Sequence, residues 1–149
     1  MATFIRSNGS PGWTSLLVLV ATLGCGPAAP YDIVPVTGKV TYEDGTPIPA
    51  DSVTILFESE APAVDAKTHP KAGRAELNSD GTFDTVTTSK AGDGAIVGRH
   101  KVVILPKDKQ QILTKAVPRE YTNKRDTPLK VDIQPGGASL EFKIQKPGK

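Results

Sequence analysis

The sequence predicts an all-β fold, namely an antiparallel β-sandwich of seven strands. Runs of alternating apolar and polar residues are short, as expected for half-buried strands. The 14 glycines and 13 prolines are spread along the chain and separate these runs. No stretch of the folded part has the periodicity of an amphipathic helix. Turn-forming residues recur about every 8–20 positions, which is typical of a sandwich.

The first element, residues 1–24, is predicted to be a cleaved signal peptide. Arg6 is followed by no charged side chain from Ser7 to Tyr31, and the apolar centre of this region runs from Trp13 to Leu23. A membrane-spanning helix needs about 20 apolar residues, roughly twice this run. A basic start, a short apolar centre and small residues after it are typical of exported proteins.

The single cysteine of the chain, Cys25, directly follows this leader. A lone cysteine has no internal disulfide partner, and in an exported protein it calls for a modification or an external partner. The ending Leu23-Gly24-Cys25-Gly26 resembles a bacterial lipobox, with Thr22 and Leu23 as its departures. The resemblance implies cleavage between Gly24 and Cys25 and a diacylglycerol on the Cys25 thiol. The alternative is an inert cysteine in a plain signal or a short membrane anchor.

Cleavage would leave a mature chain of 125 residues (149 − 24) with a formal charge of +1, because Arg6 is lost from a total of +2. Residues 25–32 are then a short tether, stiffened by proline. By the same resemblance, Gly26 permits transfer to the outer membrane. A charge this small, with no long basic run, gives no electrostatic footprint for nucleic-acid binding.

The folded domain is predicted over residues 33–146, and its strands are separated by turns. Asp44-Gly45 predicts a tight turn, and Ser79-Asp80-Gly81 predicts a hairpin between its flanking runs. The stretch between Pro106 and Leu129 is predicted to be a long loop or a helical turn. The seven strand-like runs are residues 36–42, 52–59, 73–77, 82–87, 98–106, 129–133 and 139–144.

Four blocks of this region resemble a known family: PVTGKVTYEDGTPIPADSVTILFE, NSDGTFDTVT, AGDGAIVGRHKVVI and VPREYTNKRDTPLKVDIQPGGASLEFKI. Together they resemble small bacterial lipoproteins, abundant in planctomycetes, that carry a carboxypeptidase regulatory-like domain. The resemblance covers about residues 34–144. It implies a transthyretin-like or immunoglobulin-like Greek-key sandwich on a cell envelope, with no catalytic activity of its own.

No catalytic or cofactor-binding set is found in the sequence. Zinc enzymes use three protein ligands, whereas the two histidines, His69 and His100, lie 31 positions apart and are both expected on the surface. A G-x-S-x-G elbow is absent, and the segment from Gly92 to Gly98 lacks the spacing of a dinucleotide loop. We therefore predict no enzyme, no cofactor and no metal.

Two minor alternatives concern stabilising chemistry. Asp80, Asp84 and Asp93 are candidate calcium ligands, although Asp80-Gly81 is better explained as a turn. Lys39 and Asp132 are candidates for an isopeptide bond, but both occupy polar positions of alternating strands.

The predicted function is that of a membrane-anchored, non-catalytic envelope lipoprotein, a binding or structural module attached through its N-terminal lipid. Its location is expected to be the outer membrane or the periplasmic face of the envelope. One alternative is a secreted, adhesin-like domain that binds a glycan or a protein through the loop of residues 107–128, with Tyr121 as a possible ligand contact. The other alternative is a calcium-stabilised accessory domain. Tyr121, like Tyr42, Phe57, Phe83 and Phe142, is otherwise expected in the core.

Overall fold

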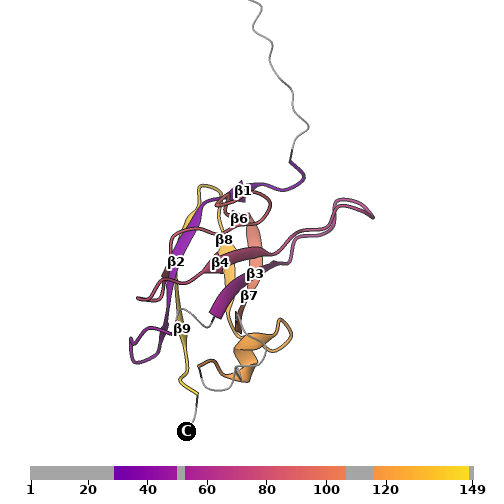
Figure 1. The fold of residues 1–149 in the computed structure, drawn as a ribbon. Coiled ribbons are helices and arrows are strands. Elements are labelled where there is room, and N and C mark those ends of the chain that lie inside the picture. The colour runs from indigo at the N-terminus through magenta and orange to yellow at the C-terminus, as the bar shows by residue number, and fades with distance from the viewer. Residues whose placement is uncertain (1–28, 50–52, 107–115, 148–149) are drawn as a thin grey trace, which may run out of the picture.

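The computed structural model describes residues 29–49, 53–106 and 116–147, so the predicted signal peptide, Cys25 and the start of the tether lie outside the described residues. The described part contains strands and one short 3-10 helix, without an α-helix (Figure 1). The strands are β1 (Ile33–Val34), β2 (Val36–Tyr42), β3 (Val53–Ser59), β4 (Gly73–Glu76), β5 (Thr82–Phe83), β6 (Ala95–Ile96), β7 (Gly98–Pro106), β8 (Lys130–Ile133) and β9 (Ala138–Ile144). The helix η3 (Arg119–Thr122) lies in the stretch where a loop or a helical turn was expected.

The all-β character predicted from the sequence is confirmed, but the strand count differs. Each of the seven predicted runs contains a strand, while the run of residues 82–87 is strand only at Thr82–Phe83. The two-residue strands β1 and β6 pair with each other and were not predicted. The described residues therefore hold nine strands instead of seven.

The larger strands form two sheets. One has the order β5-β2-β9, and the other has the order β4-β3-β7-β8. The prediction that all strands pair antiparallel is wrong for one pair, because β2 and β9 run parallel from Val36 beside Ala138 to Tyr42 beside Ile144. Parallel neighbours need a long connection, and here nearly the whole domain connects the first long strand to the last.

The predicted hairpin around Asp80-Gly81 is also wrong. The turn itself forms, since the N–H of Gly81 donates to the carbonyl of Asn78 at 2.9 Å and the N–H of Thr82 donates to the Asp80 carboxylate at 2.9 Å. However, β4 pairs with β3 and β5 pairs with β2. The turn therefore carries the chain from one sheet to the other.

The two sheets share one apolar core. Phe57 of β3 lies at its centre, fully buried, with its ring 5.9 Å from that of Phe83 on β5 and 6.3 Å from that of Phe142 on β9. Because β5 and β9 belong to the other sheet, these contacts join the sheets face to face in a sandwich-like arrangement. Tyr42 and Tyr121 are also buried, so all five aromatic residues expected in the core are found there.

His100 corrects the expectation of a surface histidine, because its side chain is only 1% exposed. Side chains alternate along a strand, so His100 shares the inward face of β7 with Val102 and Ile104. Its ring packs edge-on against Phe57, and its Nε2 lies 2.6 Å from the carbonyl oxygen of Ile96. Its Nδ1 is buried without a hydrogen-bond partner among the described residues.

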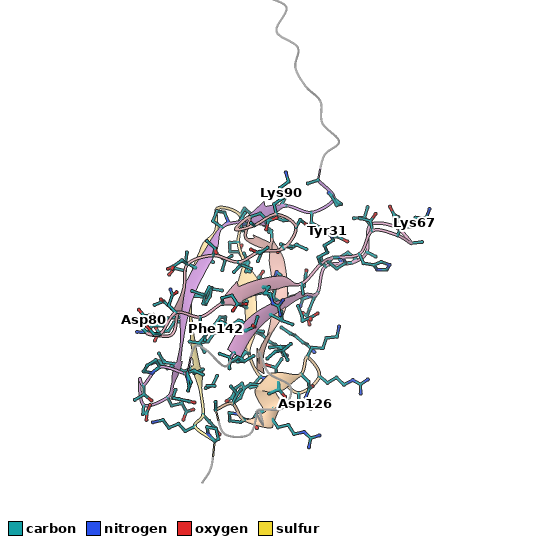
Figure 2. All side chains as sticks on the ribbon, viewed as in Figure 1. Tyr31, Lys67, Asp80, Lys90, Asp126 and Phe142 are labelled. Atoms are coloured by element: carbon teal, nitrogen blue, oxygen red, sulfur yellow. The ribbon has the colours of Figure 1, made fainter. Side chains whose placement is uncertain are left out.

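Figure 2 shows how the ends of the molecule differ. Tyr31, Lys67 and Lys90 lie toward the end where the described chain begins. Asp126 lies toward the opposite end. The end of the domain where the described chain begins therefore carries Tyr31, Lys67 and Lys90.

Candidate functional site

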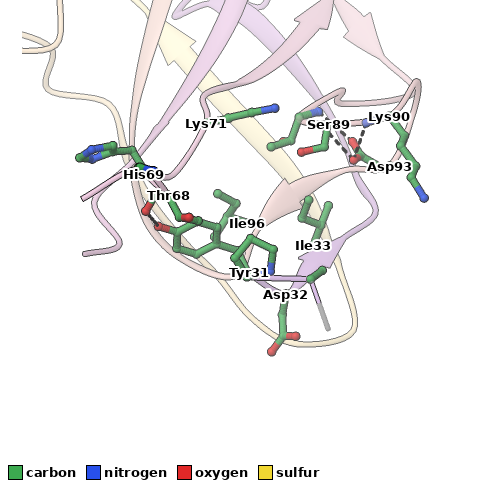
Figure 3. Close-up of a pocket in the computed structure, with 14 residues that line it drawn as sticks. Tyr31, Asp32, Ile33, Thr68, His69, Lys71, Ser89, Lys90, Asp93 and Ile96 are labelled. Carbon is green, nitrogen blue, oxygen red and sulfur yellow. Dashed lines mark hydrogen bonds between the residues drawn. The ribbon is translucent and has the colours of Figure 1, made fainter. Parts of the chain in front are cut away.

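The candidate site is a pocket at the end of the domain where the described chain begins, here called the N-terminal pocket. Its volume is about 640 Å³. It is formed by residues 29–33, by the stretch that precedes β4 and by the turn that precedes β6 (Figure 3). Its lining is Ala29, Pro30, Tyr31, Asp32, Ile33, Lys67, Thr68, His69, Lys71, Thr88, Ser89, Lys90, Asp93 and Ile96.

Tyr31 attaches the start of the domain to the long segment between β3 and β4. Its hydroxyl lies 3.1 Å from the carbonyl oxygen of Pro62 and 3.2 Å from that of Thr68, so it donates to one or the other. Both acceptors lie on residues 60–72, which project from the sheets as an arm (Figure 1). The hydroxyl thus fixes the start of the domain against this arm.

A closed turn forms the tip of the arm. The Asp65 carboxylate accepts the N–H groups of Lys67 and Thr68, both at 2.7 Å, as well as the Thr68 hydroxyl at 3.0 Å. The N–H groups of Lys67 and Thr68, followed by that hydroxyl, lower the pKa of Asp65. The N–H of Val64 closes the turn by donating to the carbonyl of Thr68. The tip is therefore held by short-range hydrogen bonds, and it presents Val64 and Lys67 outward.

The opposite wall of the pocket is a turn organised by Asp93. Its carboxylate accepts three backbone N–H groups, from Thr88 at 2.8 Å, Ser89 at 3.0 Å and Lys90 at 2.8 Å. Partial burial by itself raises the pKa of Asp93, but these N–H groups together outweigh that effect and lower it. Gly94 closes the turn by donating its N–H to the carbonyl of Val86 at 2.7 Å.

Three lysines surround the N-terminal pocket, and each comes from a different place in the chain. Lys67, Lys71 and Lys90 are all exposed, and none forms an ion pair with another described residue. In Figure 3 the Lys71 side chain extends toward Ser89, whereas the Asp32 carboxylate points away from that turn. The pocket thus combines positive charge with the hydroxyl groups of Thr68 and Ser89.

A second depression lies over the three-stranded sheet, with a volume of about 520 Å³. Lys39 stands there together with the acidic residues Asp84 and Glu141. The Asp84 carboxylate already accepts the side-chain amide of Asn78 at 2.9 Å. Because this depression has one lysine against two carboxylates, it favours an anionic ligand less than the N-terminal pocket does.

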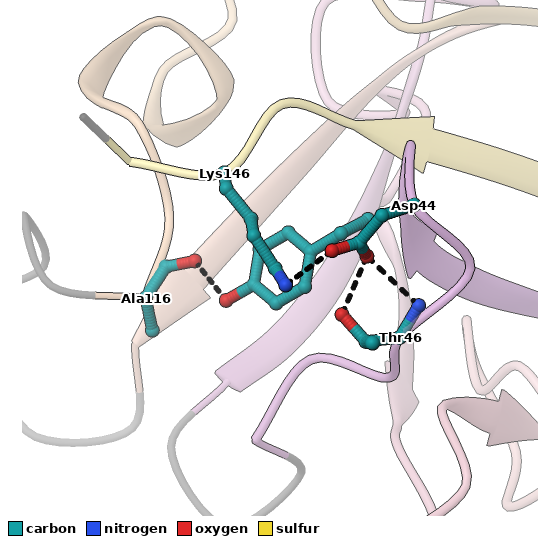
Figure 4. A network of polar contacts seen from close by, with 5 residues as sticks. Asp44, Thr46, Ala116 and Lys146 are labelled. Atoms are coloured by element: carbon teal, nitrogen blue, oxygen red, sulfur yellow. Dashed lines mark hydrogen bonds and ion pairs between the residues drawn. The ribbon is translucent and has the colours of Figure 1, made fainter. Parts of the chain in front are cut away.

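A polar cluster joins the last residues of the domain to the turn after β2 (Figure 4). The Asp44 carboxylate pairs with the Lys146 ammonium group and accepts both the N–H of Thr46 at 3.0 Å and its hydroxyl at 2.6 Å. Lys146 also lies 5.3 Å from the ring centre of Tyr42, whose hydroxyl donates to the carbonyl of Ala116 at 2.7 Å. Every polar group of this cluster has a partner within it, which indicates a structural role.

The site residues predicted from the sequence divide into two groups. Gly24 and Cys25, the predicted cleavage and lipid-attachment residues, lie outside the described residues. Tyr121 lies on η3 and is 5% exposed, and its hydroxyl accepts the N–H of Gln145 at 3.4 Å. That position indicates packing at the end of the core and leaves little of its ring for a ligand.

The candidate metal ligands are not brought together. Among residues 29–49, 53–106 and 116–147, no group of three or more His, Cys, Asp or Glu side chains could hold a metal ion. His69 is exposed on the arm, and His100 is in the core. The Asp80 and Asp93 carboxylates serve as acceptors within their own turns.

The residues considered for an isopeptide bond are also apart. Lys39 lies on β2 of the three-stranded sheet, and Asp132 lies on β8 of the four-stranded sheet. Both are exposed. They belong to the solvent-facing surfaces expected for polar positions of alternating strands.

The chain matches no family model, no curated protein and no solved structure. Within the described part of the chain, no helix has the length and apolar character needed to cross a membrane.

Proposed function

We propose that this chain is a lipid-anchored, non-enzymatic module of a bacterial envelope, cut between Gly24 and Cys25 and attached to a membrane through Cys25. In this proposal the folded part is a carboxypeptidase regulatory-like domain with a transthyretin-like sandwich. It faces the periplasm or is carried to the outer membrane. The observation that carries the proposal is the position of the single cysteine at the end of the apolar leader.

The distance from Cys25 to the fold supports anchoring close to a bilayer. Ala29, which already lines the N-terminal pocket, is the fourth residue after Cys25. An extended chain covers at most about 3.6 Å per residue, so these four positions span no more than about 14 Å. Two or more acyl chains on Cys25 would hold the protein stably and keep this end of the domain near the headgroups.

The use of the polar side chains supports a module without catalysis. The Asp65 and Asp93 carboxylates hold backbone N–H groups in turns, and that of Asp44 holds Thr46 and Lys146. The histidine of the core, His100, packs against an aromatic ring. These groups thus hold the fold together, and a general acid or base must instead be within reach of a substrate.

Metabolic labelling with a palmitate analogue in a bacterial host tests the anchor. We expect the wild-type chain to incorporate the label, and the intact mass of the mature protein to correspond to a chain beginning at Cys25. The Cys25→Ser variant should lose the label, because serine has no thiol to form the thioether. The Gly26→Ser variant is the matched control and should keep the label. A label that survives in Cys25→Ser, or a mature chain with an unmodified thiol, contradicts the proposal.

A further inference from the structure

The lining of the N-terminal pocket carries more positive than negative charge. Three lysines line it, against the two acidic residues Asp32 and Asp93, while the Asp65 carboxylate at the tip of the arm is held by the N–H groups of Lys67 and Thr68. The Asp93 carboxylate is occupied by three backbone N–H groups, and that of Asp32 points away from the turn of Ser89 (Figure 3). The lysine ammonium groups are therefore left without an acidic partner among the described residues.

The arm adds an apolar contact to this face. Val64 is 59% exposed, and it is the one large hydrophobic residue that is exposed in the described part of the chain. It lies in the same closed turn as Lys67, which Asp65 holds in place. An apolar side chain next to a cation is the combination found where proteins contact the boundary between headgroups and acyl chains.

The position of this face determines which partners it can contact. Tyr31, Lys67 and Lys90 lie toward the end where the described chain begins (Figure 2). Ala29 lines the same pocket and is separated from Cys25 by only three residues. If Cys25 is lipidated, the short tether holds the pocket and the arm close to the headgroups of the bilayer.

We propose that the N-terminal pocket and the tip of the arm bind the phosphate groups of anionic membrane lipids, with Lys67, Lys71 and Lys90 as the cations and Val64 at the apolar boundary. This proposal rests on the proposed anchoring at Cys25. A basic side chain close to an anionic leaflet strengthens binding roughly fivefold. The Ser89 hydroxyl adds a hydrogen-bond donor for phosphate oxygens. The contact would orient the anchored domain on its membrane.

The test uses the full mature chain, lipidated at Cys25 and reconstituted in nanodiscs that contain a lipid with a nitroxide on its headgroup. Paramagnetic relaxation of the Val64 methyl groups is compared between phosphatidylcholine discs and discs with added phosphatidylglycerol, with Asp126 at the opposite end as an internal reference. We expect relaxation at least about fivefold stronger in the anionic discs, because each of the three lysines contributes roughly that factor to binding. The triple variant Lys67→Gln, Lys71→Gln, Lys90→Gln should abolish this difference. These side chains are exposed and make no ion pair, so the variant should fold normally.

A second triple variant, Lys39→Gln, Arg125→Gln, Lys130→Gln, removes the same amount of charge from exposed positions elsewhere that make no ion pair, and it should keep the difference. Equal relaxation in both kinds of disc, or equal loss in both triple variants, overturns the proposal. Shifts of the Ser89 resonance with inorganic phosphate, without any dependence on disc composition, would assign the pocket to a free anion and also overturn it. A chain that does not stay with the discs contradicts the anchor itself, whereas an anchored chain that ignores the headgroup charge contradicts only this inference.

Discussion

Gly94 occupies the position where a side chain is least tolerable. Its φ is +109°, and a Cβ atom there would lie 1.8 Å from the carbonyl oxygen of Val34. We predict that Gly94→Ala lowers the free energy of unfolding by about 3 kcal/mol or more, since backbone strain of this kind costs about 1–3 kcal/mol before any steric clash. Urea unfolding followed by circular dichroism measures the loss.

Gly45 is the matched control for this prediction. Its φ is +82°, but a Cβ atom would meet no atom within 4 Å. Gly45→Ala should therefore cost only the left-handed conformation, about 1–2 kcal/mol. Equal losses in the two variants would show that the clash between a side chain at position 94 and the Val34 carbonyl does not contribute to the loss of stability.

His100 shows why one residue can be misplaced from sequence. Its charged neighbours Arg99 and Lys101 predict a surface position, whereas the strand alternation places it inward with Val102 and Ile104. The apolar residues 102–105 are consecutive and occupy both faces of the strand, so alternation in the sequence does not identify His100 as a core residue. The unpartnered Nδ1 depends on packing against other strands, which no local pattern encodes.

At the scale of the elements, local patterns located the long strands and failed for the short ones. Alternation over several residues marks β2 and β3, and a β-branched run that ends at a proline marks β7. The strands β1 and β6 have two residues each, which is too few for any periodicity to show.

The pairing of the elements was harder to predict than their existence. A turn such as Asp80-Gly81 fixes the local bend but not the sheet that each flanking strand joins. The parallel pairing of β2 with β9 depends on contacts between the two ends of the domain. Non-local packing decides both outcomes, and turn chemistry alone cannot supply this information.

The cluster at Asp44 gives a prediction for pH dependence. The hydrogen bond to Lys146, followed by those to Thr46, lowers the pKa of Asp44 from 3.8 to about 2. A group with a depressed pKa in the folded state stabilises above its unfolded pKa and loses this contribution as the pH falls through the folded value. We predict that the melting temperature of the wild type exceeds that of Asp44→Asn at pH 6, and that the difference shrinks between pH 4 and pH 2.

The Asp44→Asn variant isolates the charge, because asparagine can still accept the N–H of Thr46 in the turn. Subtracting the two pH profiles removes the contributions of Asp65, Asp80 and Asp93, whose pKa values are also lowered. A difference that stays constant from pH 6 to pH 2 would mean that the ion pair with Lys146 does not contribute to stability.

At the scale of the whole molecule, Phe57 joins the two sheets. It is fully buried, and its ring lies near Phe83 and Phe142 of the opposite sheet. We predict that Phe57→Ala lowers the free energy of unfolding by about 3–5 kcal/mol, the usual loss for a large buried ring. Val64→Ala, at an exposed position, should change it by less than about 0.5 kcal/mol. A small loss in Phe57→Ala would show that the sheets do not depend on this contact.

The candidate site could be predicted only in part. Cys25 and Gly24 are predicted from their place after the apolar segment, which is a linear feature of the chain. The N-terminal pocket is not, because Tyr31, Lys71 and Lys90 come from three separated segments that only the fold brings together. Their spacing in the sequence shows no pattern that distinguishes them from other exposed lysines and tyrosines.

The length of the tether gives a prediction for the whole anchored molecule. If Cys25 is lipidated as proposed, the position of Ala29 at the pocket holds the headgroups at a high effective concentration, which falls as a flexible linker becomes longer. Inserting a long Gly-Ser segment between Gly26 and Pro27 should leave palmitate labelling unchanged, since Cys25 and the leader are intact. The relaxation of Val64 in anionic discs should fall several-fold.

An equally long proline-rich insertion should reduce the relaxation of Val64 further, because such a spacer is extended and holds the domain away from the bilayer. If neither insertion changes the signal, the domain contacts the membrane without help from its tether, and the short distance from Cys25 to the fold has no functional weight.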